Sequence, residues 1–516
     1  MKRWWTWVLI GIGGLLIGCQ RGAPSPFLRP SSVLPTPVPS PSPMAPSPRC
    51  ALPFRPHRAL PAVDLSALSW AEMPLIGHSV RLLGSSPRPL LPLTISPDGR
   101  WLVVVFPRDE VDGSAEVALV ALHGAARRWL NRQVDLLSPY VAASALPLAA
   151  WTRWRGLPWT VSWLADGSVL WLDEAGQIWR DTGVETQSVS APAPVDWIEV
   201  QATGQGLARG DPSGLWRVDV MRGRWEPVGP EAVQQSALGG WGPGGAWFLV
   251  WTSRPSDAPP GPTLPGATWT ELTFWRVPLA EGQPAHRLGR VTLPLVGTDA
   301  WMPPSQRLAA GRWWVLGLPL AGAGVGALVD TEEGQWRDAP ALGLPPGGRM
   351  VGIQASPQGG WVMVAGQRPE DREGQGMLRL WDGNLTASIW SGEGVGVVAW
   401  HPEDEAVVLG EGGFGPPDTL APLAVLRLPP TEAPRRLEGA GWPVAFTREW
   451  VVAQDRAHPA RVLAFDLDGN QRDALDLSRQ VERVRTMLGA GDAVYLDVGW
   501  AEGDECRYGL VEWRPR

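Results

Sequence analysis

The stretch that decides the fold is TISPDGRWLVVV, residues 94–105. Its first two residues end one apolar run, and Trp101–Val105 form a second run after a four-residue turn. Pro97 presets φ for the turn, Asp98 can hydrogen-bond to nearby backbone, and Gly99 accepts a positive φ. The stretch therefore predicts an antiparallel β-hairpin.

Weaker copies of this hairpin recur along the chain past residue 60. They keep Pro or Asp together with Gly, as in VSWLADGSVLWL (161–172) and IQASPQGGWVMVA (353–365). Nine candidate turns are centred near residues 97, 165, 204, 243, 309, 357, 402, 447 and 490. Most separations lie between 39 and 48 residues, and two are longer, at 68 and 66. We expect the two long intervals to contain loop insertions.

A repeat of about 40 to 50 residues with four short strands is typical of a propeller blade. Ser96–Val105 also resembles the repeat of the TolB-like class of WD-type β-propellers, whose blades carry a Ser-Pro-Asp-Gly turn between the inner strands. We therefore expect an all-β fold, a single β-propeller with four-stranded antiparallel blades. Because propellers usually have four to eight blades, we expect eight, with seven as the alternative and one turn spurious or split.

The two ends of the folded region are expected to meet in one blade. The last hairpin, AVYLDVGW (493–500) followed by YGLVEWRPR (508–516), ends without an outer strand. HSVRLLGSS, residues 78–86, is the segment we expect to complete it. A disulfide between Cys50 and Cys506 would lock the same seam in an exported protein. The alternative is two unpaired thiols.

The first 18 residues, MKRWWTWVLIGIGGLLIG, predict an export signal. A basic start precedes an uncharged stretch that is short for a bilayer span. Leu16–Cys19 resembles the lipobox of bacterial lipoproteins. This resemblance implies cleavage before Cys19, lipidation of its thiol and attachment to the outer face of the cell membrane or envelope. The alternative is a plain signal peptide, or an anchor helix with a chance cysteine.

Residues 19–60 are expected to form a lipidated, disordered tether, and residues 61–516 the propeller. Ten prolines lie between Arg21 and Arg49. Proline removes backbone donors and favours polyproline II, which rises about 3.1 Å per residue. Thirty such residues would reach on the order of 90 Å, enough for a stalk.

Charge and composition narrow the choice of partners. The formal net charge is −7 over 516 residues, and no run of five basic residues occurs. Nucleic acid is therefore not an expected partner. Lys2 is the only lysine, which excludes a catalytic lysine from the folded part. We expect a monomer that contacts the membrane through its lipid.

No motif for catalysis, a cofactor or a metal was found. The six histidines stand singly, and neither a Cys-x-x-Cys nor a Gly-x-Ser-x-Gly sequence is present. The acidic clusters at 370–373 and 403–405 are interpreted as solvated loops. Asp466 and Asp468 lack the register of a calcium loop and predict a hairpin turn. We interpret the recurring tryptophans as packing residues, with sugar stacking as the alternative for a minority; they are Trp101, Trp163, Trp247, Trp361 and Trp400.

These features favour a binding or scaffolding module for a protein, peptide or glycan. The alternative is an extracellular hydrolase or lyase, in which carboxylates from different blades converge in the funnel. A third interpretation is a fixed subunit of an envelope assembly. The only site residues assigned are Cys19 for lipidation and the pair Cys50 and Cys506.

Overall fold

The computed structural model describes residues 62–75, 78–107, 114–135, 161–173, 175–195, 197–210, 214–229, 237–257, 267–296, 306–307, 312–320, 324–337, 342–344, 349–368, 376–411, 421–503 and 505–516. All of them lie in the compact unit Pro48–Arg516. Their regular secondary structure consists of strands joined by turns and connections, together with the short 3₁₀ turns η1 (Leu65–Ala67) and η2 (Pro243–Gly245). Over this described part of the chain, no helix has the length and apolarity to cross a membrane.

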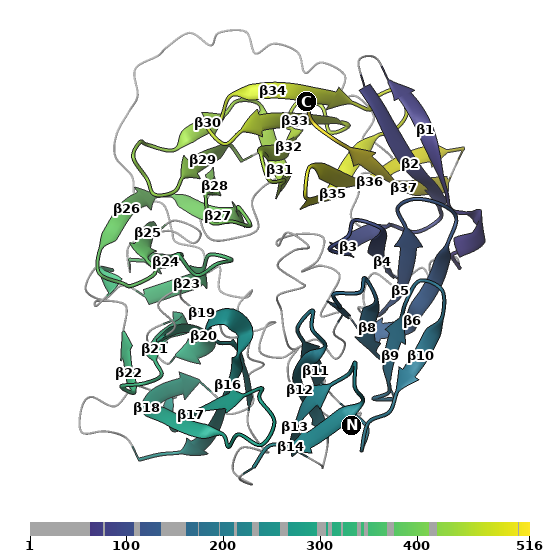
Figure 1. Ribbon diagram of the computed structural model, residues 1–516. Helices are drawn as coiled ribbons and strands as arrows, with labels where there is room; N and C mark the ends of the chain where they lie inside the picture. The colour runs from purple at the N-terminus through teal and green to yellow at the C-terminus, as the bar shows by residue number, and fades with distance from the viewer. Residues whose placement is uncertain are drawn as a thin grey trace, which may run out of the picture. The chain divides into compact units, whose positions relative to one another are not determined.

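The strands form nine antiparallel blades that follow one another around a centre (Figure 1). Blade 1 contains β3 (Leu91–Ile95), β4 (Trp101–Pro107), β5 (Ser114–Ala121) and β6 (Arg127–Asp135). Blade 2 contains β7 (Val161–Trp163), β8 (Val169–Leu172), β9 (Ile178–Asp181) and β10 (Thr186–Val189). Blade 3 contains β11 (Trp197–Val200), β12 (Gln205–Gly210), β13 (Gly214–Asp219) and β14 (Arg224–Pro227).

The next three blades are linked into one continuous sheet by two single residue pairs, Leu295 with Leu320 and Gly324 with Met350. Blade 4 contains β15 (Ala237–Trp241), β16 (Trp247–Pro255), β17 (Ala267–Pro278) and β18 (His286–Val296). Blade 5 contains β19 (Gln306–Arg307), β20 (Trp313–Leu320), β21 (Gly324–Asp330) and β22 (Gln335–Arg337). Blade 6 contains β23 (Arg349–Ala355), β24 (Trp361–Gln367), β25 (Met377–Asp382) and β26 (Ser388–Glu393).

Two four-stranded blades precede the last blade, which combines both ends of the described chain. Blade 7 contains β27 (Val395–Trp400), β28 (Ala406–Glu411), β29 (Leu423–Arg427) and β30 (Arg435–Leu437). Blade 8 contains β31 (Ala440–Phe446), β32 (Trp450–Asp455), β33 (Arg461–Asp466) and β34 (Gln471–Asp476). Blade 9 contains β35 (Arg483–Ala490), β36 (Ala493–Glu502) and β37 (Glu505–Trp513), followed by β2 (His78–Ser86) and β1 (Ser69–Leu75).

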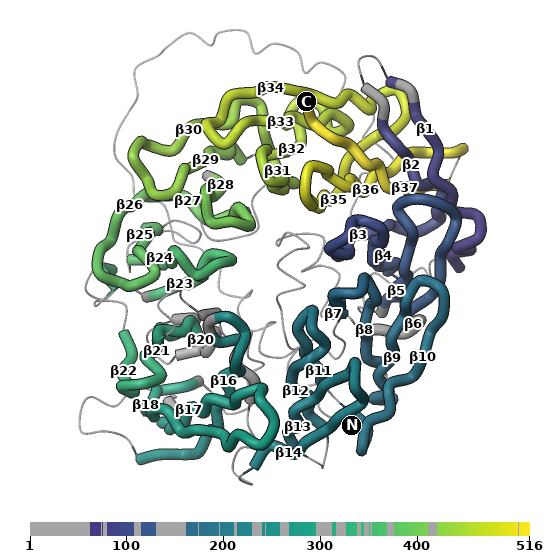
Figure 2. The backbone as a smooth tube through the Cα atoms, in the orientation of Figure 1, coloured from purple at the N-terminus to yellow at the C-terminus, as the bar shows by residue number. Residues whose placement is uncertain are grey.

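The predicted closing strand, residues 78–86, is confirmed with the same bounds. β2 pairs antiparallel with β37, for example Leu82 with Val511, and so occupies the outer position that the C-terminal hairpin lacks. β1 adds a fifth strand outside β2, which the sequence did not predict. The path of the tube in Figure 2 shows the first and last strands lying side by side in this blade.

Nine buried hydrophobic clusters fill the nine spaces between neighbouring blades. Strand alternation explains how one strand serves two spaces, because successive side chains point to opposite faces. On β4, Val103 and Val105 pack towards blade 2, whereas Leu102 and Val104 pack towards blade 9. Each blade is therefore apolar on both faces, and closure of the ring leaves neither face exposed.

The expectation of eight blades, or seven, was wrong. All nine candidate turns join the first two strands of a blade, so none was spurious. The error came from weighting the usual upper limit of eight blades over the nine turns that the sequence contains. The two long intervals do contain insertions, in the connections 136–160, 256–266 and 297–305.

Antiparallel alternation gives the ring two different rims. We name the rim with the turns between the first and second and between the third and fourth strands the turn rim. Its connections have two to seven residues. The opposite rim, which we name the loop rim, carries the connections between the second and third strands and between blades. Every connection longer than seven residues lies there: 136–160, 228–236, 256–266, 297–305, 338–348, 368–376 and 412–422.

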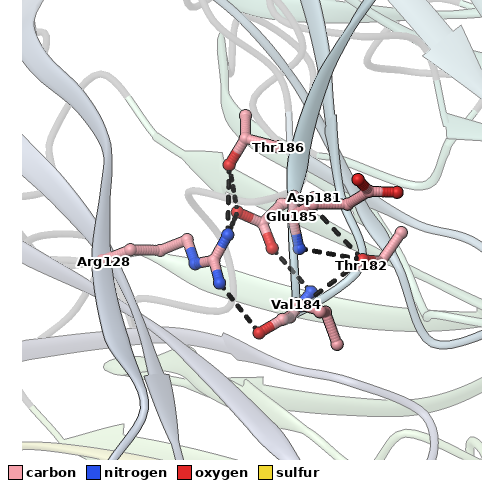
Figure 3. A network of polar contacts seen from close by, with 7 residues as sticks. Arg128, Asp181, Thr182, Val184, Glu185 and Thr186 are labelled. Carbon is pink, nitrogen blue, oxygen red and sulfur yellow. Dashed lines mark hydrogen bonds and ion pairs between the residues drawn. The ribbon is translucent and has the colours of Figure 1, made fainter.

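Hydrogen bonds at the turn rim cross all nine junctions between blades. Arg128 of β6 donates to Asp181 Oδ2 of blade 2 at 3.0 Å (Figure 3). It also donates to Gly183 O in the following turn at 2.8 Å. The same kind of contact recurs with different donors and acceptors. From blade 2 onward the contacts are Ala165 N to Ala202 O, Gln201 Nε2 to Gly245 O, Gly289 N to Thr331 O, Arg337 Nη1 to Leu385 O, Ser356 Oγ to Asp404, His401 Nε2 to Arg448 O, Arg448 N to Gly491 O, and Arg81 Nη1 to His123 Nδ1.

The turn of blade 6 lacks the aspartate that the turn of blade 1 contains, and Asp404 of blade 7 supplies the missing acceptor. In blade 1, Asp98 accepts a hydrogen bond from Ser96 Oγ of its own turn at 2.5 Å. The turn of blade 6 has Gln358 in that position. Asp404, from blade 7, accepts instead from Ser356 Oγ at 2.5 Å and from the backbone amides of Gln358 and Gly360 at 3.0 and 2.9 Å. The prediction that residues 403–405 are a solvated loop was therefore wrong for Asp404, which is buried.

We predict that Asp404→Gly destabilises the ring by about 2 kcal/mol, because it leaves buried donors without an acceptor. Glycine is chosen because residue 404 has φ +61, a conformation that glycine adopts without strain. Thermal and urea unfolding measure the change. The control is Asp468→Ala, which removes an exposed ion pair with Arg427 and is expected to cost less than about 1 kcal/mol. Equal losses in the two variants would contradict the assignment.

Candidate functional site at the seam

Of the three predicted site residues, the structure describes one. Cys506 is the second residue of β37 and pairs with Ala501 across the β36–β37 hairpin, at the loop rim of blade 9. Cys19 and Cys50 lie outside the described residues, so lipidation and the disulfide stay predictions. Cys506 belongs to blade 9, which meets blade 1 at a joint that we name the seam.

The N-terminal segment enters the ring on the rim of blade 9 that also holds Cys506. Asp64 caps η1 by accepting from Ser66 N at 2.9 Å, and Leu65 and Leu68 are buried in the cluster between blades 9 and 1. β1 then starts at Ser69, opposite Gly84 near the end of β2. This end of β2 leads through residues 87–90 to blade 1, which places the entry point on the loop rim, the rim that also holds Cys506.

At its turn-rim side, the seam is held by Arg81. This guanidinium forms an ion pair with Glu512 of β37 and lies 4.8 Å from the centre of the Trp70 ring. It also donates to His123 Nδ1 of blade 1 at 3.0 Å. Because arginine has only donors, His123 Nδ1 accepts, and the neutral ring carries its proton on Nε2. One side chain thus connects β1, β2, β37 and blade 1.

At its loop-rim side, the seam contains a buried ion pair. Arg88 lies in the connection 87–90 and pairs with Glu116 of β5, and the two side chains are 2% and 5% exposed. Arg88 N also donates to Ser86 Oγ at 3.1 Å. Because a charge so deeply buried needs its partner, this pair fixes how the chain passes from blade 9 into blade 1.

Between these two contacts lies Asp497 of β36, which is fully buried. Arg485 Nε of β35 is 3.9 Å from its Oδ2, and neither carboxylate oxygen has a hydrogen-bond partner of ordinary geometry in the described protein. Burial raises the pKa of Asp497 to about 7, although Arg485 and the backbone amide of Leu90 act to lower it. The Arg485 guanidinium also lies 4.9 Å from the centre of the Tyr508 ring.

The tryptophans named from the sequence lie in the packing between blades, which confirms that interpretation. Trp247 and Trp400 are buried, and the others are partly buried against the same hydrophobic clusters. Trp361 Nε1 donates to Asp404 O at 3.1 Å, so this ring also crosses a junction. These indole side chains therefore fill the spaces between blades.

The histidines and the acidic turn are also structural. His401 is buried, accepts from Glu403 N at 3.2 Å and contacts Arg448 O at 3.1 Å. Asp466 accepts from the backbone amides of Asp468 and Asn470, as the hairpin prediction requires. Burial raises the pKa of Asp466, but bonds from Asn470 and Arg472 lower it overall. Over the described ranges, no three acidic, histidine or cysteine side chains are grouped to hold a metal. The cluster at 370–373 lies outside these ranges.

The innermost strands bear on the hydrolase or lyase alternative. Figure 1 shows the first strand of each blade nearest the centre, as for β23, β27, β31 and β35. Across the described first strands, the only carboxylate residue is Glu199 on β11. No pair of inward carboxylates is therefore brought together on these described strands.

Sequence reasoning missed the charged groups of the seam. Glu116 stands in SAEVALVA and Asp497 in AVYLDVGW, each a single acid within an apolar strand. An acid at such a position is rarely buried without a partner, and this was the available signal. The partners, Arg88 and Arg485, are distant in sequence or on another strand, so the pairing itself had no local pattern.

Comparisons with known proteins identify no family for this chain. No family model and no curated protein sequence matches the chain. The Cps50 (Swd1) β-propeller domain from Myceliophteria thermophila is 12% identical, with a TM-score of 0.30, covering 62% of this chain and 97% of that one. Oligogalacturonate lyase from Vibrio parahaemolyticus is 11% identical, with a TM-score of 0.37, covering 88% of this chain and 98% of that one. The fold assignment rests on the nine blades and the hydrophobic clusters between them.

We predict that Glu116→Gln destabilises the protein by about 3 to 5 kcal/mol, because it leaves the buried Arg88 charge without its partner. The double variant Arg88→Met with Glu116→Leu removes both charges and is expected to lose less than the single variant. Urea unfolding of the three proteins measures the difference. A double variant that is less stable than Glu116→Gln would show that the pair does not act as a unit.

Proposed function

We propose that this chain is an exported, lipid-anchored β-propeller that binds or scaffolds a protein, peptide or glycan through its loop rim. The observation that carries the proposal is the asymmetry between the two rims. All seven connections longer than seven residues emerge on one of them. Long loops on a rigid scaffold are the usual place of recognition.

The opposite rim supports the same proposal by supplying rigidity. Short turns that are hydrogen-bonded across every junction hold the blades in register, as the Arg128 contacts illustrate. A scaffold that does not deform on binding loses less conformational entropy, which favours affinity. The turn rim is thus the framework, and the loop rim the variable surface.

The anchor is proposed from the N-terminal sequence. Leu16–Cys19 resembles a lipobox, and the proline-rich segment that follows suits a stalk. The resemblance of Ser96–Val105 to TolB-like repeats fits a protein of the bacterial envelope. Two acyl chains or one chain with a second signal hold a protein stably at a membrane surface.

We further propose the bridge between Cys50 and Cys506. Cys506 and the entry point of the N-terminal segment lie on the same rim of blade 9. Eleven residues lie between Cys50 and Ala62, the first described residue, and the twelve steps from Cys50 to Ala62 span up to about 40 Å when extended. The bridge would tie the base of the tether to the last strand of the ring.

The binding proposal is tested by blocking each rim separately in the full-length protein. A polyethylene glycol chain is attached at Asp257→Cys or Ala457→Cys on the loop rim, and at Arg222→Cys or Asp468→Cys on the turn rim. We expect at least one loop-rim adduct to reduce capture of partners from envelope extracts and glycan arrays about tenfold, roughly 1.4 kcal/mol of binding free energy. Both turn-rim adducts should bind like the unmodified protein. Loss of binding only with turn-rim adducts, or no partner with the unmodified protein, would contradict the proposal.

Peptide mapping by mass spectrometry without reduction tests the two cysteine assignments together. We expect the mature chain to start at Cys19 with an added acyl mass, and one peptide pair to link Cys50 with Cys506. The variant Cys19→Ser should carry no acyl mass at residue 19, because the Cys19 thiol is the proposed acceptor of the lipid. An unmodified N-terminal leader, or separate Cys50 and Cys506 peptides, would refute the corresponding assignment.

A further inference from the structure

The carboxylate of Asp497 lies between blade 9 and blade 1, on the blade in which two neighbouring strands, β2 and β37, pair without a covalent connection. Its register partners are Thr486 on β35 and Leu510 on β37. Both Asp497 oxygens and Thr486 Oγ1 are buried without an ordinary hydrogen-bond partner in the described protein. Leu90, at the entry to blade 1, supplies the nearest backbone amide. A charge on Asp497 would therefore fall directly at the contact between blade 9 and blade 1.

The surroundings cannot easily compensate for that charge. Arg485 is the one cation near Asp497, but it lies beyond hydrogen-bond distance at 3.9 Å and also stacks on Tyr508. The other charged side chains of the seam are engaged with each other, as in the pairs of Arg81 with Glu512 and of Arg88 with Glu116. The ionisable groups on the elements packed around Asp497 include Arg483 and Arg485 on β35, Tyr495 and Glu502 on β36, Glu505, Cys506, Arg507, Tyr508 and Glu512 on β37, Arg81 on β2, Arg88 in the connection 87–90, and Glu116 on β5.

We propose that Asp497 is a proton-operated latch on ring closure, which holds blade 9 against blade 1 when protonated and loosens this joint when ionised. In the protonated form, the apolar contacts of Leu90, Leu510 and their neighbours close over an uncharged group. In the ionised form, the carboxylate is stabilised by hydration. Water reaches it only when the connection 87–90 separates from β36. The latch does not depend on the proposed binding role.

The direction of the effect follows from proton linkage. The pKa of Asp497 is about 7 in the closed joint, above the ordinary value of 3.8 that applies once the group is exposed. The closed joint therefore binds the proton more tightly. Protonation of Asp497 stabilises the closed joint fully below pH 4. This stabilisation decreases as the pH rises towards 7 and does not decrease further at higher pH.

Hydrogen exchange of the full-length protein between pH 5 and pH 8 tests the latch. The measured quantity is the protection of amides in peptides covering residues 86–95, corrected for intrinsic exchange rates. Protection in the wild type should fall by up to about a hundredfold over this range, whereas Asp497→Asn should change by less than about threefold. The matched control is Asp466→Asn, a carboxylate in the exposed turn of blade 8, which should keep the wild-type dependence.

A second variant keeps the proposal testable if Asp497→Asn does not fold. Arg485→Gln removes the cation that lowers the pKa of Asp497, so the loss of protection should move to higher pH. The proposal is overturned if the wild type keeps constant protection from pH 5 to pH 8. It is also overturned if Asp497→Asn loses protection as the wild type does, or if Arg485→Gln leaves the midpoint unchanged.

Discussion

The pairing of β2 with β37 is the constraint on which the rest of the structure depends. A blade with two apolar faces is stable only between two neighbours, so a row of nine such blades needs its ends joined. The N-terminal strand supplies the outer position that the C-terminal hairpin leaves open, with Leu82 opposite Val511. This pairing gives the ninth hydrophobic cluster, between blades 9 and 1, a composition like that of the other eight. It also brings four buried charged residues to one joint, Arg88, Glu116, Asp497 and Glu512.

Alternation of antiparallel strands separates two tasks between the rims. The turn rim needs short connections, because its hydrogen bonds to neighbouring turns require fixed backbone positions. Asp404 shows that the contact matters more than the residue that makes it, since it replaces an acid that the turn of blade 6 lacks. The loop rim has no such requirement, and its connections range from one residue to 25. Sequence can therefore vary on the loop rim without disturbing the ring, as a recognition surface requires.

Most of the fold was predictable, because it depends on local patterns. The nine turns have Pro, Asp or Gly where the backbone needs them, and the period-2 apolar runs that flank the turns predict strands. Residues 78–86 were identified because the last hairpin lacked an outer strand. The blade count was wrong because a general limit was preferred to the turns themselves. The seam charges were missed for a physical reason. Alternation shows that Asp497 shares a face with Tyr495, but not that the face is buried against Leu90, some 400 residues away in the sequence.

A cryo-electron microscopy reconstruction of the purified protein, viewed along the axis of the ring, tests the central claim most directly. The account predicts nine blades, with density for β2 continuous with β37 in the five-stranded blade. Eight or seven blades, or a gap between the first and last blades, would contradict it.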